Sequence, residues 1–224
     1  MKRILMLAAA AICLCGPSLS AQQVTINEKS LLNKLERSDA DIANPKKSGK
    51  ASTWIHRGEV FYEVATAVSK HLYDGIDVVT LTTLFGEPTA AEVVELNGKV
   101  YTKGIFPYMD IYLDELAIPV AWIMTKEIYP GALQKSVEAY EKAYELDGNN
   151  QKTAEKVNEG LKQAYDEYSK TGALYFPLGM YEEAGNMFIS AYEVAQMPGA
   201  TISEADLYSL LHDAGLAFML AQKY

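Results

Sequence analysis

Apolar and small residues recur every three or four positions through most of this chain, which is the period of an amphipathic helix. The clearest pair of such segments runs from Tyr168 to Phe176 and from Tyr181 to Val194. Between them, Pro177 cannot continue a helix because it lacks a backbone donor, and Gly179 permits a tight turn. The pattern therefore predicts two helices joined by a short turn.

The order of large and small residues within this pair is distinctive. Tyr168-x-x-Thr171-Gly172-x-x-Tyr175 precedes the turn and Ala184-x-x-x-Phe188 follows it. Gly172 and Ala184 have almost no side chain, so we expect facing helices to approach closely there while the rings fill the surrounding space. The order resembles the tetratricopeptide repeat, in which a Trp-x2-Leu-Gly-x2-Tyr block and an Ala-x3-Phe block occupy about 34 residues.

The first block occurs twice more in the chain. It is Trp54-x-x-Arg57-Gly58-x-x-Phe61 in one copy and Leu211-x-x-Ala214-Gly215-x-x-Phe218 in the other. A second block, Ser136-x-x-x-Tyr140, lies in a helix expected from Leu133 to Leu146. We interpret this helix as the partner of the Trp54 helix, although residues 75–130 separate the two.

The resemblance implies a mainly α-helical fold, a solenoid of antiparallel helix pairs over residues 51–224 with an insertion at residues 75–130. Residues 22–50 are expected to form a lead and a partial capping helix from Lys29 to Ala43. The helix that contains Leu211 to Phe218 is expected to have one uncovered face. Either a longer array or self-association through this C-terminal helix would account for that face.

The inserted region does not follow the repeat. Glu92–Leu96 and Lys99–Thr102 flank Asn97-Gly98, which is typical of a tight β-hairpin. Residues from Asp77 to Leu84 are mostly β-branched, and Met109 to Tyr129 is predicted to be helical with a kink at Pro119. Long insertions in repeat arrays often lie on the binding face. Filling a gap beside the array is the other interpretation.

The N-terminus has the order of a secretory signal peptide over residues 1–21. A basic head is followed by an apolar run from Ile4 to Cys15, which at about a dozen residues is too short to span a bilayer. Small residues then predict cleavage near Ser20 or Ala21, and hence a periplasmic or secreted protein with no membrane insertion after cleavage. An N-terminal anchor and a lipoprotein are the alternatives. Both cysteines lie in this segment, so no disulfide is expected in the mature chain.

Charge and motifs narrow the function classes. The formal net charge is −9, which disfavours nucleic acid and anionic lipid as partners. The three histidines do not have metal-ligand spacing, and the sequence has no nucleophile elbow, phosphate loop or dinucleotide fingerprint. We therefore expect a protein that is not an enzyme and needs no cofactor or metal.

With its signal peptide, the chain resembles exported tetratricopeptide repeat proteins of Gram-negative bacteria, particularly those of Bacteroidota. Members of the family bind peptides or proteins in a groove lined by the first helix of each repeat. The resemblance implies a non-catalytic protein–protein interaction scaffold of the bacterial envelope that binds an apolar or mildly basic peptide. By position, the expected groove residues are Ser52, Ile55, Glu59, Tyr62, Asp166, Ser169, Ala173, Phe176, Ser209, His212, Leu216 and Met219.

Aromatic residues of the insertion support an alternative function, the binding of a small molecule or glycan. Packing of the same side chains into a core is the competing explanation. The residues concerned are Tyr101, Phe106, Tyr108, Tyr112 and Trp122.

Overall fold

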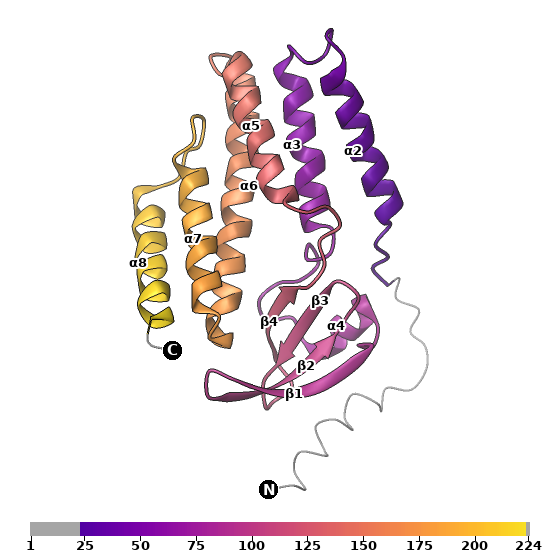
Figure 1. Ribbon diagram of the computed structural model, residues 1–224, viewed down its shortest axis with the longest axis vertical. Coiled ribbons are helices and arrows are strands. Elements are labelled where there is room, and N and C mark those ends of the chain that lie inside the picture. Colours follow the sequence, from indigo (N-terminus) through magenta and orange to yellow (C-terminus); the bar gives the residue numbers. More distant parts are fainter. Residues whose placement is uncertain (1–22, 223–224) are drawn as a thin grey trace, which may run out of the picture. The chain divides into compact units, whose positions relative to one another are not determined.

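The computed structural model describes residues 23–222, and the predicted signal peptide lies outside them. The described chain is mainly helical, with seven α-helices and one four-stranded antiparallel sheet (Figure 1). It forms two compact units. The sheet unit comprises residues 23–26, Val68–Lys126 and Pro177–Gly179, and the helical unit comprises the remaining segments.

The helical unit contains six of the helices. Their positions confirm the helices expected near residues 29–43, 133–146, 168–176 and 181–194. They are α2 (Glu28–Ala43), α3 (Ala51–Thr66), α5 (Ala132–Asp147), α6 (Gln151–Tyr175), α7 (Tyr181–Ala195) and α8 (Glu204–Ala221).

These helices pack mainly against their neighbours. α2 contacts α3, α3 contacts α5, and α5, α6, α7 and α8 follow in sequence order, while α3 also contacts α6. The turn between α6 and α7 is short, and Gly179 adopts a positive φ of 73° in it. α3 and α5 lie side by side although the sheet unit separates them in sequence (Figure 1). The predicted pairing of these two helices across the insertion is therefore confirmed.

A recurring contact explains why the paired helices fit. A Cβ atom on Gly58 of α3 would lie 2.7 Å from the ring of Tyr140 in α5, and a Cβ on Gly172 of α6 would lie 2.6 Å from the ring of Phe188 in α7. Each ring occupies space that only glycine leaves open. We call this a glycine–ring contact. In the first pair, Ser136 Oγ also donates a hydrogen bond of 2.8 Å to the backbone carbonyl of Gly58.

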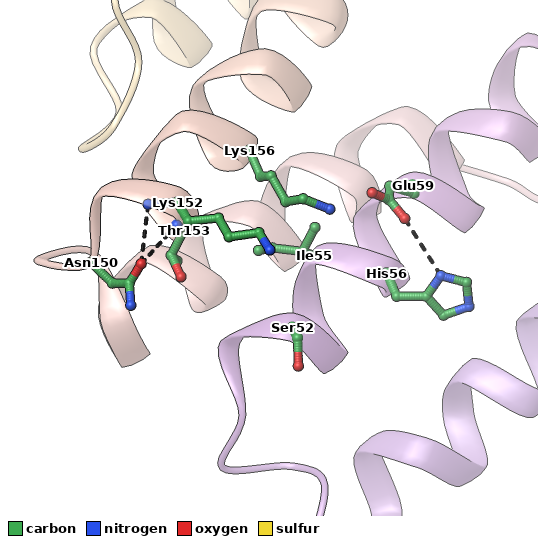
Figure 2. Close-up of a pocket in the computed structure, with 8 residues that line it drawn as sticks. All are labelled: Ser52, Ile55, His56, Glu59, Asn150, Lys152, Thr153 and Lys156. Atoms are coloured by element: carbon green, nitrogen blue, oxygen red, sulfur yellow. Dashed lines mark hydrogen bonds and ion pairs between the residues drawn. The ribbon is translucent and has the colours of Figure 1, made fainter.

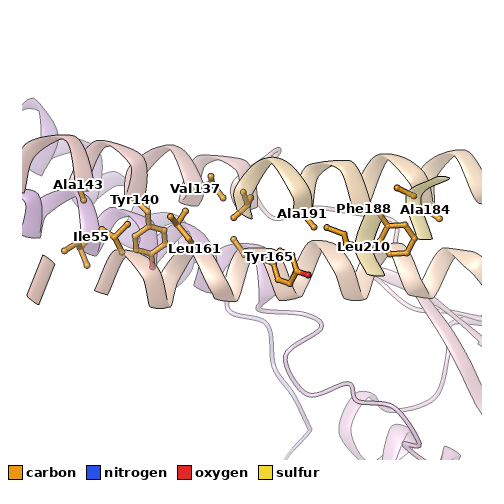
Figure 3. Packing of buried hydrophobic residues seen from close by; sticks show 14 of the residues in the cluster. Ile55, Val137, Tyr140, Ala143, Leu161, Tyr165, Ala184, Phe188, Ala191 and Leu210 are labelled. Carbon is orange, nitrogen blue, oxygen red and sulfur yellow. The ribbon is translucent and has the colours of Figure 1, made fainter. Parts of the chain in front are cut away.

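One continuous apolar core runs through the helical unit (Figure 3). Its centre is the buried stripe of α6, in which Val157, Leu161 and Ala164 are fully covered. Tyr140 of α5 reaches this stripe as well as α3, because Gly160 of α6 leaves room for its ring. The core thus joins successive helix pairs and does not stop at the boundary between them.

α2 is fixed on α3 by buried leucines and by ion pairs. Leu31 and Leu35 are buried on α2. Lys34 Nζ lies 2.6 Å from Glu63 Oε1, and Arg57 Nη1 lies 2.7 Å from Asp39 Oδ1. α2 thereby covers the side of α3 that faces away from α5 and α6 (Figure 1).

The sheet unit holds the strands β1 (Ala90–Leu96), β2 (Lys99–Ile105), β3 (Met109–Leu113) and β4 (Pro119–Met124), in the order β1-β2-β3-β4. The hairpin at Asn97-Gly98 is confirmed, since Leu96 pairs with Lys99 and both turn residues have positive φ. The β-branched segment after Ile76 forms a helix, α4 (Val78–Phe85), whose first turn is capped by the Asp77 side chain.

The predicted helix from Met109 to Tyr129 is wrong, because this segment forms β3 and β4. The Asp114 side chain accepts hydrogen bonds from the backbone N–H groups of Leu116 and Ile118, both at 2.9 Å, and so forms the turn between the strands. Pro119 begins β4, which is an edge strand, where a missing backbone donor is tolerated. The proline that was expected to kink a helix therefore opens a strand.

Candidate functional site, the face between α3 and α6

Three of the expected groove residues line one shallow cavity of about 390 Å³ in the helical unit. Ser52, Ile55 and Glu59 reach it from α3, and Asn150, Lys152, Thr153 and Lys156 reach it from the start of α6 (Figure 2). Ile55 is the buried apolar member, and charged side chains surround it. The cavity therefore joins an apolar floor to a charged rim.

A second cavity of about 120 Å³ shares Glu59 and Lys156 with the first and adds Tyr140, Glu159, Gly160 and Gln163. Because the two cavities share lining residues, they form one depression along the line where α3 faces α6. We call this depression, together with Tyr62 and Asp166, the α3–α6 groove.

The start of α6 is held by local hydrogen bonds. The Asn150 side chain accepts from the backbone N–H groups of Lys152, at 3.0 Å, and Thr153, at 3.4 Å. Thr153 Oγ1 lies 3.2 Å from Asp147 Oδ2 at the end of α5. These contacts fix the first turn of α6, and hence the points from which Lys152 and Lys156 extend toward α3 (Figure 2).

Sequence reasoning did not place the two lysines in the groove. α6 begins well before the repeat block that starts at Tyr168, and the expected set followed the block only. Counting back from Asp166 in steps of three and four gives Gln163, Glu159, Lys156 and Lys152, and all four line the cavities. The helical period was the signal that could have found them.

Carboxylates follow the same line farther along the groove. Burial raises the pKa of the Tyr62 hydroxyl on α3, and the Glu167 and Asp166 carboxylates of α6 raise it further. Burial likewise raises the pKa of Tyr140 well above its usual range, with Glu59 and Glu159 adding to the effect. Glu59, Glu159 and Tyr140 also line the second cavity together, which puts these two carboxylates in the groove. The middle of the groove is therefore acidic.

Asp166 connects this acidic row to α8. Burial raises the pKa of the Asp166 carboxyl, Lys162 lowers it, and the Asp206 carboxylate at the start of α8 raises it. Asp206 itself accepts a hydrogen bond of 2.6 Å from the Ser203 hydroxyl in the cap of α8. The acidic stretch thus draws on three helices, with Glu59 on α3, Asp166 on α6 and Asp206 on α8.

Lysine and histidine side chains occupy one end of the groove. His56 Nδ1 lies 3.5 Å from Glu59 Oε2, and Figure 2 shows Lys156 extending toward the same carboxylate. Within the described residues, neither Lys152 nor Lys156 forms an ion pair of 4 Å or less. Lys152 lines only the first cavity, at the start of α6, whereas Lys156 lines both cavities, so the second cavity holds two carboxylates, Glu59 and Glu159, and one lysine.

The other expected residues have different surroundings. Phe176 packs against the rings of Tyr181 and Phe188, at centroid distances of 5.5 and 6.2 Å, on the side of α6 that α7 covers. Ala173 is exposed and Ser169 is half-buried on α6. On α8, Ser209, His212 and Met219 are exposed and Leu216 is half-buried. His212 has its own neighbour, with Nδ1 3.2 Å from Asp213 Oδ1.

The aromatic residues of the insertion lie mostly inside the sheet unit. Tyr101, Phe106, Tyr112 and Trp122 are buried, and the Tyr101 hydroxyl donates a hydrogen bond of 2.9 Å to the Pro177 carbonyl. Tyr108 is half-buried beneath Lys126, whose Nζ is 4.9 Å from the ring centroid. A sugar-stacking platform needs exposed ring faces, and these rings mainly fill a core.

Within residues 23–222, no group of three or more His, Cys, Asp or Glu side chains is arranged to hold a metal ion. No helix in this range combines the length and apolar character that a membrane crossing requires. Comparison of the chain with protein-family models, with curated proteins and with solved structures returns no match.

Proposed function

We propose that the chain is a non-catalytic interaction scaffold and that its helical unit is a tetratricopeptide-like solenoid of antiparallel helix pairs. Two helix pairs, α3 with α5 and α6 with α7, share the same glycine–ring contact. α8 carries the same first-block residues and packs on α7. This regularity supports the family resemblance better than any single motif does, because a lone helical hairpin has no repeat to match.

The ligand proposed for the α3–α6 groove is an extended segment of a partner protein that carries apolar and basic side chains. The observation that carries this proposal is the open depression between α3 and α6. Ile55, Glu59 and Glu159 are among the residues that line it. Ile55 would contact an apolar side chain, and a lysine or arginine would pair with the carboxylates in the middle. The predicted signal peptide puts the partner among envelope or secreted proteins.

Binding can be tested with a fluorescein-labelled peptide of alternating lysine and leucine and a matched peptide of glutamate and leucine. We expect the lysine peptide to bind the protein, and the double variant Glu159→Gln with Asp166→Asn to weaken that binding by about tenfold, as the loss of two charge contacts implies. Fluorescence anisotropy at two salt concentrations measures the effect. The glutamate peptide should bind much more weakly.

The matched control removes two carboxylates from elsewhere on the helical unit. Glu182 and Glu193 are exposed on α7, outside the groove lining. Glu182→Gln with Glu193→Gln changes the net charge by the same amount and should leave the affinity nearly unchanged. If the two double variants lose the same amount of affinity, then peptide binding depends on net charge alone, and the groove proposal is wrong.

Asp166 also gives a prediction about stability and pH. Its folded-state pKa is raised, mainly by burial, so the ionised carboxyl destabilises the native state at neutral pH, and that penalty disappears as the pH falls through the raised pKa. Asp166→Asn should therefore raise Tm at pH 7 by about 1–2 °C, a small change because the carboxyl is only partly buried. Differential scanning calorimetry should show the difference vanishing near about pH 3.

A further inference from the structure

α8 repeats the register of α6 residue by residue. Aligning the two first blocks matches Gly215 with Gly172, Leu211 with Tyr168 and Tyr208 with Tyr165. On α6, α7 covers this stripe at Gly172, where the Phe188 ring lies over the glycine.

The stripe on α8 is uncovered in the described chain. Tyr165 is 9% exposed, whereas Tyr208 is 78% exposed. A Cβ atom on Gly172 would meet the Phe188 ring, whereas a Cβ on Gly215 would have nothing within 4 Å. Leu211 and Met219, one turn before and one turn after Gly215, are 44% and 49% exposed. An apolar face centred on a glycine therefore stands open.

The side of α8 opposite this open face is packed against the rest of the helical unit. Leu210, Ala214 and Ala217 on the opposite side of α8 are buried against the rest of the helical unit. The Phe218 ring lies over Gly185 of α7, where a Cβ would approach it to 2.7 Å. α8 is thus a fixed element, and the Gly215 face is a formed surface.

The chain itself indicates what such a face accepts. α7 covers α6 with Ala184, Phe188 and Ala191, and α5 covers α3 with Ser136, Tyr140 and Ala143. Both covering helices have a small residue, a ring four positions later and an alanine three positions after the ring. In both, the ring occupies the space over a glycine.

We propose that the Gly215 face of α8 docks an amphipathic helix of a partner protein, with a ring seated over Gly215 and small residues one turn to either side. A basic side chain on that helix would face Glu204, which lies on the same side of α8 as Gly215, and α8 carries no lysine or arginine within Glu204–Ala221. A second copy of this chain is a poorer occupant, because its α8 has the same negative charge and its α5 and α7 stripes are already buried.

The test uses a fluorescein-labelled peptide with the sequence of residues 180–196 in which Glu182, Glu183 and Glu193 are replaced by lysine. We expect saturable one-to-one binding to the purified protein. Phe188→Ala in the peptide and Gly215→Leu in the protein should each weaken binding by about tenfold or more, because each removes the seat of the ring. Gly49→Leu is the matched control, since Gly49 also has nothing within 4 Å and lies in a loop.

Circular dichroism of Gly215→Leu must match the parent, which separates loss of binding from loss of fold. Absence of saturable peptide binding, or equal binding by Gly215→Leu and the parent, overturns the proposal. Light scattering that shows the parent to be a dimer and Gly215→Leu to be a monomer also overturns it, because the occupant is then a second copy. The groove variants Glu159→Gln and Asp166→Asn should bind this peptide as the parent does, so the two proposals fail independently.

Discussion

Tyr140→Ala is expected to lower the free energy of unfolding by about 3–5 kcal/mol, the range for deleting a buried ring. The Tyr140 side chain is 2% exposed, and its ring lies where a Cβ on Gly58 of α3 or on Gly160 of α6 would be. One ring therefore fills space against two helices. Its removal leaves a cavity that two glycines border, and neither glycine has a side chain with which to fill it.

Urea denaturation followed by far-UV circular dichroism measures this loss. Tyr208→Ala is the matched control, because Tyr208 is 78% exposed and the same atoms are removed. That variant should change the unfolding free energy by less than about 0.5 kcal/mol, as surface substitutions usually do. A Tyr140→Ala variant that unfolds at the same urea concentration as Tyr208→Ala would show that the packing around Tyr140 is incorrect.

Gly172→Leu and Gly215→Leu should change stability in opposite directions, although the substitution and the helical register are the same. At Gly172 the new side chain would overlap the Phe188 ring, and overpacking of this kind costs about 1–3 kcal/mol. At Gly215 the space is open, so the better helix propensity of leucine should stabilise α8 by roughly 0.5–1 kcal/mol.

Thermal denaturation of the two variants beside the parent checks the pair. Gly172→Leu should melt below the parent and Gly215→Leu slightly above it. If the two variants melt together, then the contact between Gly172 and Phe188 does not restrict α6 and α7. A Gly215→Leu protein that is strongly destabilised would instead mean that the Gly215 face is already covered in solution.

Much of the helical unit could be predicted because its signals are local and repeated. The glycine and ring positions of the Trp54 and Tyr140 segments identified α3 and α5 as partners even though residues 75–130 intervene. A glycine on one helix and a ring at the facing position of the other specify a close contact, whatever the length of the chain that connects the two helices. Sequence separation therefore did not hide the pair.

β3 and β4 were missed because their evidence is tertiary. Tyr112, Trp122 and Ile123 suit a helix or a strand in a short apolar segment, and periodicity alone cannot separate the two. The Asp114 turn and the edge position of Pro119 decide the outcome, and the edge exists only once the strands of the sheet have been assigned. Pro119 would interrupt a helix, whereas it is tolerated at the start of an edge strand.

Only some of the residues that line the α3–α6 groove could be expected from the sequence. Ile55 and Glu59 were expected from their block positions and do line the main cavity. Lys152 and Lys156 were not, because the extra N-terminal turns of α6 lie outside the repeat block. Phe176 was expected at the groove, but the short turn into α7 places its ring beside Phe188. A repeat template gives the face of a helix, and helix length and turn geometry then add or remove residues.

The separation of α3 from α5 along the chain has a consequence for how this protein could change over time. The entropic cost of closing a loop grows only with the logarithm of its length, by about 0.6 kcal/mol for each doubling. Because Tyr140 and Gly58 hold the two helices together directly, the excursion between Thr66 and Ala132 can lengthen, shorten or be exchanged at little energetic cost. The contact between α3 and α5 therefore does not depend on the length of the segment that is inserted between them.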